Sequence, residues 1–252
     1  MLLIGLNTAT FRQLKTDHLF RVVEVKHLEA LEWAGDCHLK PGDLKMARMI
    51  REQTDALNVA LNSYGFYYRF EEHQSFERKL ETAAEMGASF TRVWAGNTSS
   101  NVCSDREKER LVQKSREAAA LAKDYHLQMA FEYHRHTLTD SVASTSDLLK
   151  AIDEDNVTSY WQPLESLTIN QRLEDLNDLL SWISNVHVFH WKDYHHRYSL
   201  DKGEKEWSNY LPVLEQMPRA YFLEFVKKDQ IQQFKNDLIT LRQWQEKYQM
   251  TQ

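Results

Sequence analysis

The sequence predicts a single (β/α)₈ barrel, and three observations support this fold class. The chain has 252 residues, the usual length of one complete barrel, and can bury a large core without disulfides. Short apolar runs alternate with longer amphipathic segments, which is typical of repeated βα units around a parallel sheet. Because the chain holds only 7 glycines and 4 prolines, long linkers are not expected, and residues 1–252 are predicted to form one domain.

Eight apolar runs are predicted to be the strands of the barrel. In chain order they span residues 2–7, 28–33, 58–64, 89–95, 127–133, 157–162, 186–191 and 220–225. Segments between them carry charges on one face and apolar residues on the other, which favours helices outside the barrel; examples are residues 44–57, 76–86, 106–125 and 230–248. Asp43 is expected to begin the first of these helices and Gly87 to follow the second.

Composition and charge exclude several classes of protein. The sequence is 42% hydrophobic and 27% charged, which is ordinary for a globular protein and too apolar for a disordered one. Its net charge of −6 leaves no basic surplus, so a nucleic-acid partner is not expected. The N-terminal apolar run is broken by Asn7, so it predicts neither a signal peptide nor a membrane span. Cys37 and Cys103 show no metal-ligand or disulfide pattern, which favours a reduced, cytoplasmic protein.

Polar residues stand at the ends of the last four predicted strands. Side chains alternate along a strand, and this alternation predicts that four of them face the barrel axis at similar depth: Glu132, Gln162, His190 and Glu224. His187 lies on the opposite face from His190 and is expected to pack against a helix. A single glutamate near a strand end is usually solvated or salt-bridged, but four polar groups at consecutive strand ends favour a site.

The residue types in this group suit a metal ion. Buried carboxylates are costly to desolvate, so two of them beside an amide and an imidazole indicate a compensating cation or a bound polar ligand. Mixed oxygen and nitrogen donors at an open site suit one divalent metal ion. Mn²⁺, Co²⁺, Mg²⁺ and Zn²⁺ all stay open, because affinity order alone does not choose among them.

Other polar and aromatic residues near the strand ends are expected to shape a substrate site. Function in a barrel collects at this face, and aromatic rings suit the C–H faces of a carbohydrate. The expected substrate-binding residues are Glu32, Asp36, His38, Asn62, Tyr64, Arg92, Trp94, His134, Trp161 and Lys192. Asp36 and His38 could equally pair to fix the loop after the second strand. His134 could orient Glu132, and Lys192 could meet a phosphate or carboxylate.

Several segments together resemble one known family. They are LEWAGDCH (31–38), SYGFYY (63–68), RVWAG (92–96), FEYH (131–134), LTD (138–140), YWQP (160–163), VFHW (188–191) and LEF (223–225). Along essentially the whole chain they resemble the xylose isomerase-like barrels of the sugar phosphate isomerase/epimerase family. The resemblance implies a metal at the barrel mouth, held at the positions of Glu132, Gln162, His190 and Glu224. Gln162 stands where the family usually has Asp, which implies weaker metal binding or a different metal preference.

The resemblance further implies an isomerase or epimerase of a sugar or sugar phosphate. The metal would acidify the C–H bond beside a carbonyl, Glu132 or Glu224 would remove the proton to give an enediolate, and the other glutamate would return it. The expected partner is a small carbohydrate, and the sequence leaves a homo-oligomer open.

Two alternatives to this function stay open, and a third is not expected. A dehydratase of a polyol or keto acid would use the same proton abstraction to expel a β-hydroxyl. A non-catalytic sugar-binding barrel would have Gln162 as the mark of lost catalysis. Hydrolysis like that of endonuclease IV is not expected, since it needs a multi-zinc cluster and an electropositive face.

Overall fold

Eight parallel strands close into a barrel in the computed structural model, which describes residues 3–24, 28–71 and 75–249. The strands are β1 (Leu3–Asn7), β2 (Ala30–Ala34), β3 (Ala60–Gly65), β4 (Phe90–Val93), β5 (Gln128–Glu132), β6 (Val157–Trp161), β7 (Ile183–Val188) and β10 (Ala220–Leu223). Each pairs in parallel with the next along the chain, and β10 pairs with β1 to complete the ring. The predicted fold class is therefore confirmed; residue 2 of the first predicted strand lies outside the described residues.

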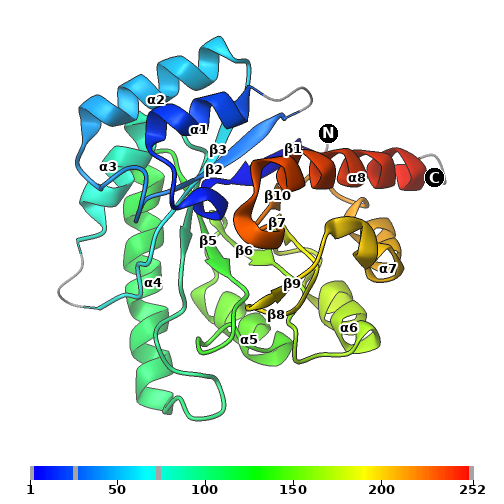
Figure 1. The fold of residues 1–252 in the computed structure, drawn as a ribbon. Coiled ribbons are helices and arrows are strands. Elements are labelled where there is room, and N and C mark those ends of the chain that lie inside the picture. The colour runs from blue at the N-terminus through cyan, green and yellow to red at the C-terminus, as the bar shows by residue number, and fades with distance from the viewer. Residues whose placement is uncertain (1–2, 25–27, 72–74, 250–252) are drawn as a thin grey trace.

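Helices surround this barrel (Figure 1). They are α1 (Thr16–Val23), α2 (Leu44–Ala56), α3 (Glu77–Glu85), α4 (Asp105–Asp124), α5 (Val142–Ile152), α6 (Ile169–Leu179), α7 (Glu204–Leu214) and α8 (Ile231–Gln249). The four helices given as examples above correspond to α2, α3, α4 and α8. Among the described residues, no helix is long and apolar enough to cross a bilayer.

Local interactions explain where some of these helices begin and end. The side chain of Asp43 accepts a hydrogen bond from the backbone N–H of Met46 at 3.1 Å and so caps α2 as expected. Ser104 and Glu107 form a reciprocal capping box at the start of α4. Gly87 follows α3 with φ of +80°, a backbone conformation that glycine adopts without strain.

The core has two layers that follow the alternation of side chains along the strands. Outward residues such as Val186 and Val188 pack with the helices in the large apolar layer. A small inner cluster consists of Ala30, Ala130, Tyr160, Ala220 and Phe222. Further along the same strands, toward their carboxyl ends, the inner positions turn polar. This change from apolar to polar places the ionisable side chains together at the barrel mouth.

Short elements after the strands cover this mouth. The 3₁₀ turn η1 (Thr8–Phe11) follows β1, and the hairpin of β8 (Trp191–Asp193) and β9 (His196–Arg197) follows β7. Two further 3₁₀ turns, η2 (Leu200–Gly203) and η3 (Lys227–Asp229), precede α7 and α8. Function in barrels collects on this side, so these segments and the strand ends define where a site is sought.

Candidate metal centre and substrate pocket

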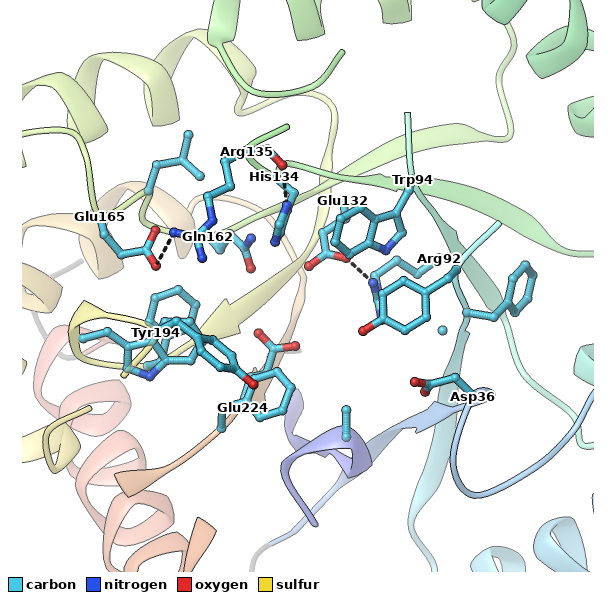
Figure 2. Close-up of a pocket in the computed structure, with 18 of the residues that line it drawn as sticks. Asp36, Arg92, Trp94, Glu132, His134, Arg135, Gln162, Glu165, Tyr194 and Glu224 are labelled. Carbon is cyan, nitrogen blue, oxygen red and sulfur yellow. Dashed lines mark hydrogen bonds and ion pairs between the residues drawn. The ribbon is translucent and has the colours of Figure 1, made fainter. Parts of the chain in front are cut away.

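Four donor groups converge at the carboxyl ends of β5, β6, β7 and β10. One ligand atom from each of Glu132, His187 and Glu224 lies within 4.8 Å of the others. The Nδ1 atom of His187 is 3.5 Å from Glu224 Oε2 and 3.7 Å from Glu132 Oε1. Gln162 Oε1 lies 3.1 Å from the same nitrogen. Figure 2 shows Glu132, Gln162 and Glu224 pointing toward a shared space.

The chemistry of this donor set fits a divalent cation. Two carboxylates, an amide oxygen and an imidazole nitrogen offer hard and borderline donors, as Mn²⁺, Mg²⁺, Co²⁺ and Zn²⁺ require. Glu132, His187 and Glu224 are all buried, so the carboxylates have little water to stabilise their charge. A cation between them would offset that cost. We call these three residues together with Gln162 the metal-site group.

An inner arginine and asparagine hold the carboxylates in place. Arg92 is buried, its Nε donates to Glu32 Oε1 at 2.7 Å, and its Nη1 donates to Glu132 Oε2. Asn7 Nδ2 donates to Glu32 Oε1 at 3.0 Å and to Glu224 Oε1 at 2.8 Å. Each of the three carboxylates therefore accepts a hydrogen bond from a buried donor, which fixes its rotamer.

The same contacts separate the proton affinities of the buried groups. Burial raises the pKa of Glu224 to about 7, with repulsion from Glu132 adding to the effect. Burial opposes the charged form of His187, but the attraction of Glu224 and Glu32 outweighs it and raises the pKa to about 9. Burial also opposes charge on Glu32, yet Arg92 and His187 lower its pKa to about 2. Glu32 thus stays ionised, whereas Glu224 can exchange a proton near neutral pH.

A cavity of about 490 Å³ opens onto the metal-site group. Glu132, Gln162 and Glu224 line it together with aromatic residues from the surrounding loops, among them Tyr67, Trp94, Phe189, Trp191 and Tyr194. Two ion pairs also line it: Arg12 with Asp36 at 2.5 Å, and Arg135 with Glu165 at 3.6 Å. An aromatic wall with a few charged groups is the usual make-up of a site for a small polar molecule.

His134 presents one ring nitrogen to this cavity. Its Nδ1 lies 2.7 Å from the backbone oxygen of Arg135. A carbonyl oxygen only accepts hydrogen bonds, so Nδ1 carries the hydrogen and Nε2 is left as the acceptor. Burial lowers the pKa of His134, and its ring packs on Trp94 with centroids 4.2 Å apart. His134 is therefore a neutral imidazole that can take a proton from a bound molecule.

The structure corrects the predicted orientations of two histidines. His190 does not join the metal-site group; its Nδ1 faces Glu206 at 3.9 Å, and its ring packs beside Gly203. His187, expected to pack against a helix, points into the barrel instead. The physical reason is that the predicted phase of the strand was wrong: Val186 and Val188 face outward in the apolar layer, so His187 between them faces inward and His190 shares the outward phase of the valines.

Other predicted substrate contacts divide into two groups. Asp36, Arg92, Trp94 and His134 line the cavity. The remaining six do not line it: Glu32, His38, Asn62, Tyr64, Trp161 and Lys192.

These six residues have other positions, which explain why they miss the cavity. His38 is buried against Thr8 Oγ1 and the backbone oxygen of Phe11 and so holds the loop, but its hydrogen bonds do not include the Asp36 partner of the alternative interpretation, because Asp36 pairs with Arg12. The Tyr64 hydroxyl donates to the backbone oxygen of Leu39 at 2.7 Å. Trp161 packs on residues of α7, and Lys192 is exposed on the hairpin. Glu32 is buried inside the barrel, and Asn62 lies within β3, where the pairing with β2 shifts register.

Sequence reasoning missed His187, although the pattern around it carried a usable indication. In β7 the apolar Val186 and Val188 alternate with the polar Asn185 and His187. Outward positions of a barrel strand pack against helices and are apolar, so the valines mark the outward face and turn His187 inward. Several other missed residues of the cavity lie in loops, where no periodicity applies, among them Arg12, Tyr67, Arg135, Glu165 and Tyr194.

Comparisons with known proteins agree with this architecture. The profile of the xylose isomerase-like TIM barrel family matches residues 20–241. No curated protein sequence matches the chain significantly. Among solved structures, the probable 3-DHS dehydratase AsbF of petrobactin synthesis from Bacillus anthracis has a TM-score of 0.81 at 19% identity, covering 96% of this chain and 99% of its own.

Two other solved structures illustrate the range of this fold. The IolI protein with a bound zinc atom has a TM-score of 0.78 at 14% identity, and covers 97% of this chain and 98% of its own. D-psicose 3-epimerase, solved in the presence of D-fructose, has a TM-score of 0.74 at 15% identity, and the match covers 96% of this chain and 99% of its own. At these identities the similarity establishes the shared fold alone.

Proposed function

Because the chain belongs to the xylose isomerase-like TIM barrel family, we propose that it is a metal-dependent isomerase or epimerase of a small sugar-like carbonyl compound. The observation that carries the proposal is the metal-site group at the inner end of a 490 Å³ cavity. Solved structures of similar fold include an epimerase and a zinc-bound protein, which supports both parts of the proposal.

The metal ion would be held by Glu132, His187, Glu224 and the amide oxygen of Gln162. It would supply positive charge that stabilises the negative charge developing on a substrate oxygen when a neighbouring C–H bond is broken. The donor types suit Mn²⁺, Co²⁺, Mg²⁺ and Zn²⁺ alike.

The two glutamates divide the proton transfer between them. Glu132 is held by the cationic Arg92, whereas Glu224 accepts a hydrogen bond from the neutral amide of Asn7. Both glutamates line the cavity from different strands, so one could remove a proton from a bound substrate and the other return one. Removal of a proton by one carboxylate and its return by another gives an epimer or an isomer. The aromatic residues around the cavity would exclude water from this exchange.

Solvent deuterium exchange tests this proposal directly. The Mn²⁺- or Co²⁺-loaded protein would be mixed in D₂O with ketohexoses, pentuloses, inososes and their phosphates, and exchange at the carbon beside the carbonyl followed by NMR. We expect exchange with at least one of these compounds, and a loss of about 100-fold or more in Glu132→Gln and Glu224→Gln. Glu206→Gln, which faces His190 outside the cavity, serves as the matched control with unchanged exchange.

Metal content and the activity of Glu132→Gln together can refute the proposed function. Protein that holds no metal after Mn²⁺ or Co²⁺ supplementation, together with unchanged activity in Glu132→Gln, would refute the proposed metal-dependent function. Metal binding without any exchange would favour a sugar-binding barrel that lacks catalysis.

A dehydratase is the second candidate, and His134 is the specific observation that favours it. Elimination of water needs a proton for the leaving hydroxyl in addition to a base that removes the α-proton. Once the Nε2 atom of His134 has taken up a proton, it could donate that proton to the leaving hydroxyl while Glu132 removes the α-proton. Arg12 and Arg135, which also line the cavity, suit a substrate that carries a carboxylate. The similar fold of the probable 3-DHS dehydratase is in line with this candidate.

The substitution His134→Gln separates the two reactions. For a dehydratase, we expect this variant to keep proton exchange while formation of the conjugated, dehydrated product falls. For an isomerase or epimerase, no dehydrated product forms with the wild type. Ultraviolet absorbance of the conjugated product and the NMR exchange assay would be read on the same samples.

A further inference from the structure

We propose that Glu32 is a positioning residue that fixes the ring orientation and the tautomer of His187, so that Nδ1 of the imidazole is presented to the metal. The proposal rests on the proposed metal-dependent function. It gives Glu32 a role different from the substrate contact expected of it above.

The two nitrogens of the His187 ring face different surroundings. Nε2 lies 3.3 Å from Glu32 Oε2, and both side chains have 0% exposure. Nδ1 faces the opposite way, toward the oxygens of Gln162, Glu132 and Glu224 at 3.1 to 3.7 Å. A carboxylate accepts hydrogen bonds and donates none, so the contact with Glu32 places a hydrogen on Nε2. The lone pair of the neutral ring is then on Nδ1, on the side of the metal-site group.

Glu32 cannot act on a substrate from this position. It is fully buried, and it is not among the residues that line the cavity, whereas its partner Arg92 is. Among the described residues, its carboxylate contacts inner groups of the barrel: it accepts from Arg92 and Asn7, faces His187 and lies near the Tyr160 hydroxyl. An effect of Glu32 on the reaction must therefore pass through one of these groups.

The two oxygens of Glu32 have separate partners. Oε1 accepts from Arg92 Nε at 2.7 Å and from Asn7 Nδ2 at 3.0 Å, and Oε2 faces His187 Nε2. Two donors on one oxygen hold the carboxylate plane, so the second oxygen cannot turn away from the ring. Such a carboxylate behind a metal-binding imidazole is known to fix the tautomer and to strengthen the ligand.

This division of partners makes the isosteric Glu32→Gln substitution informative. A glutamine has one acceptor oxygen and one donor nitrogen. If its oxygen stays with the two donors Arg92 and Asn7, its NH₂ group faces His187 Nε2. That contact favours a lone pair on Nε2 and a hydrogen on Nδ1, which is the tautomer that cannot bind the metal. A residue with a purely structural role would leave the tautomer unchanged.

The experiment combines metal affinity with the tautomer of His187. Co²⁺ would be titrated into the wild type, Glu32→Gln, Glu32→Asp and the control Glu206→Gln against a competing chelator, with the visible spectrum of bound Co²⁺ recorded. Zn²⁺-loaded, ¹⁵N-histidine-labelled samples would report by NMR which ring nitrogen carries the hydrogen, with His187 assigned by its absence in His187→Asn. Circular dichroism would verify folding. Glu32→Asp keeps the negative charge for Arg92 but is one carbon too short to reach His187.

We expect Co²⁺ affinity to fall about 10- to 100-fold in Glu32→Gln and Glu32→Asp and to stay unchanged in Glu206→Gln. The wild type should show the hydrogen on Nε2, and folded Glu32→Gln should lose that state. If either folded variant binds Co²⁺ within about 2-fold of the wild type with an unchanged tautomer, the inference is overturned while the metal-dependent function stands. If the wild type binds none of Co²⁺, Mn²⁺ or Zn²⁺, the metal-dependent function fails and the inference falls with it.

Discussion

Replacement of Gln162 by glutamate should strengthen metal binding. Gln162 Oε1 lies 3.1 Å from His187 Nδ1 and faces the same space as the carboxylates of Glu132 and Glu224. Glutamate has the same length and shape as glutamine, so Gln162→Glu adds one negative charge at this point without changing the reach of the side chain. It also tests the residue at which this chain departs from the aspartate that the family resemblance implies.

The size of the effect follows from the short distances in the group. Two unit charges about 4 Å apart at an effective dielectric constant of about 20 interact by about 4 kcal/mol, and a divalent cation doubles this to about 8 kcal/mol. Without the cation, the crowded carboxylates would take up protons, and release of these protons on binding offsets most of that gain. We expect a net gain of about 1.4 to 2.8 kcal/mol, which corresponds to about 10- to 100-fold in affinity.

Calorimetry with Mn²⁺ and Co²⁺ would measure this gain, and thermal unfolding with and without metal would check it. The variant should unfold at a lower temperature than the wild type without metal, because of repulsion from Glu132 and Glu224. It should unfold at a higher temperature when metal is in excess. Affinities within about 2-fold of the wild type for both metals would refute the reasoning, since Gln162 would then not adjoin the cation.

Three further predictions concern other parts of the structure. His187→Ala should weaken Co²⁺ binding by about 100-fold or more, while His190→Ala should leave it unchanged; equal effects in calorimetry would contradict the assignment of the ligand. Arg135→Ala should raise KM for an anionic substrate with little change in kcat, and an equal rise for a neutral sugar would argue against charge recognition. Burial raises the pKa of Glu215 from 4.5 to about 7, and neither carboxylate oxygen has a hydrogen-bond partner among the described residues. Because the pKa is raised in the folded state, the stability that the protonated group contributes is complete below pH 4.5 and is lost as the pH rises through 7. The free energy of unfolding of Glu215→Gln relative to the wild type should therefore rise by about 1 to 2 kcal/mol between pH 4.5 and 8, after a discount for partial exposure. Urea unfolding at pH 5 and pH 8 would measure the free energy of unfolding of both proteins. A difference between them that does not change with pH would contradict the prediction.

The barrel and part of its metal-site group could be predicted from the sequence because both follow from periodicity. Apolar runs separated by amphipathic segments can bury their apolar faces only as a sheet covered by helices, and this requirement acts locally on every βα unit. Along β5, the inward position of Glu132 follows from the same alternation that turns Ala130 into the barrel. The inward position of Glu224, just after β10, follows in the same way from the inward position of Phe222 two residues earlier.

The choice between His187 and His190 could not be decided by alternation alone. Either phase is consistent with period 2, and alternation does not show which of the two faces of β7 the helices cover. Beyond that residue the chain turns into the hairpin, where the backbone oxygen of His190 accepts from the N–H of Tyr198 at 2.9 Å. The apolar Val186 and Val188 favour the observed phase, but only the tertiary structure shows that helices cover the face on which they lie.

The sequence by itself therefore determined the architecture and the strand ends from which a metal site is built, since hydrophobic periodicity is a property of neighbours along the chain. Only the tertiary structure decided which groups meet. Arg92 and Glu32 come from different strands, 60 residues apart, and their pairing at 2.7 Å depends on closure of the ring. The role of Glu32 behind His187, 155 residues away, likewise exists only when the strands enclose a common interior. Contacts between such distant residues are set by packing, which no local pattern encodes.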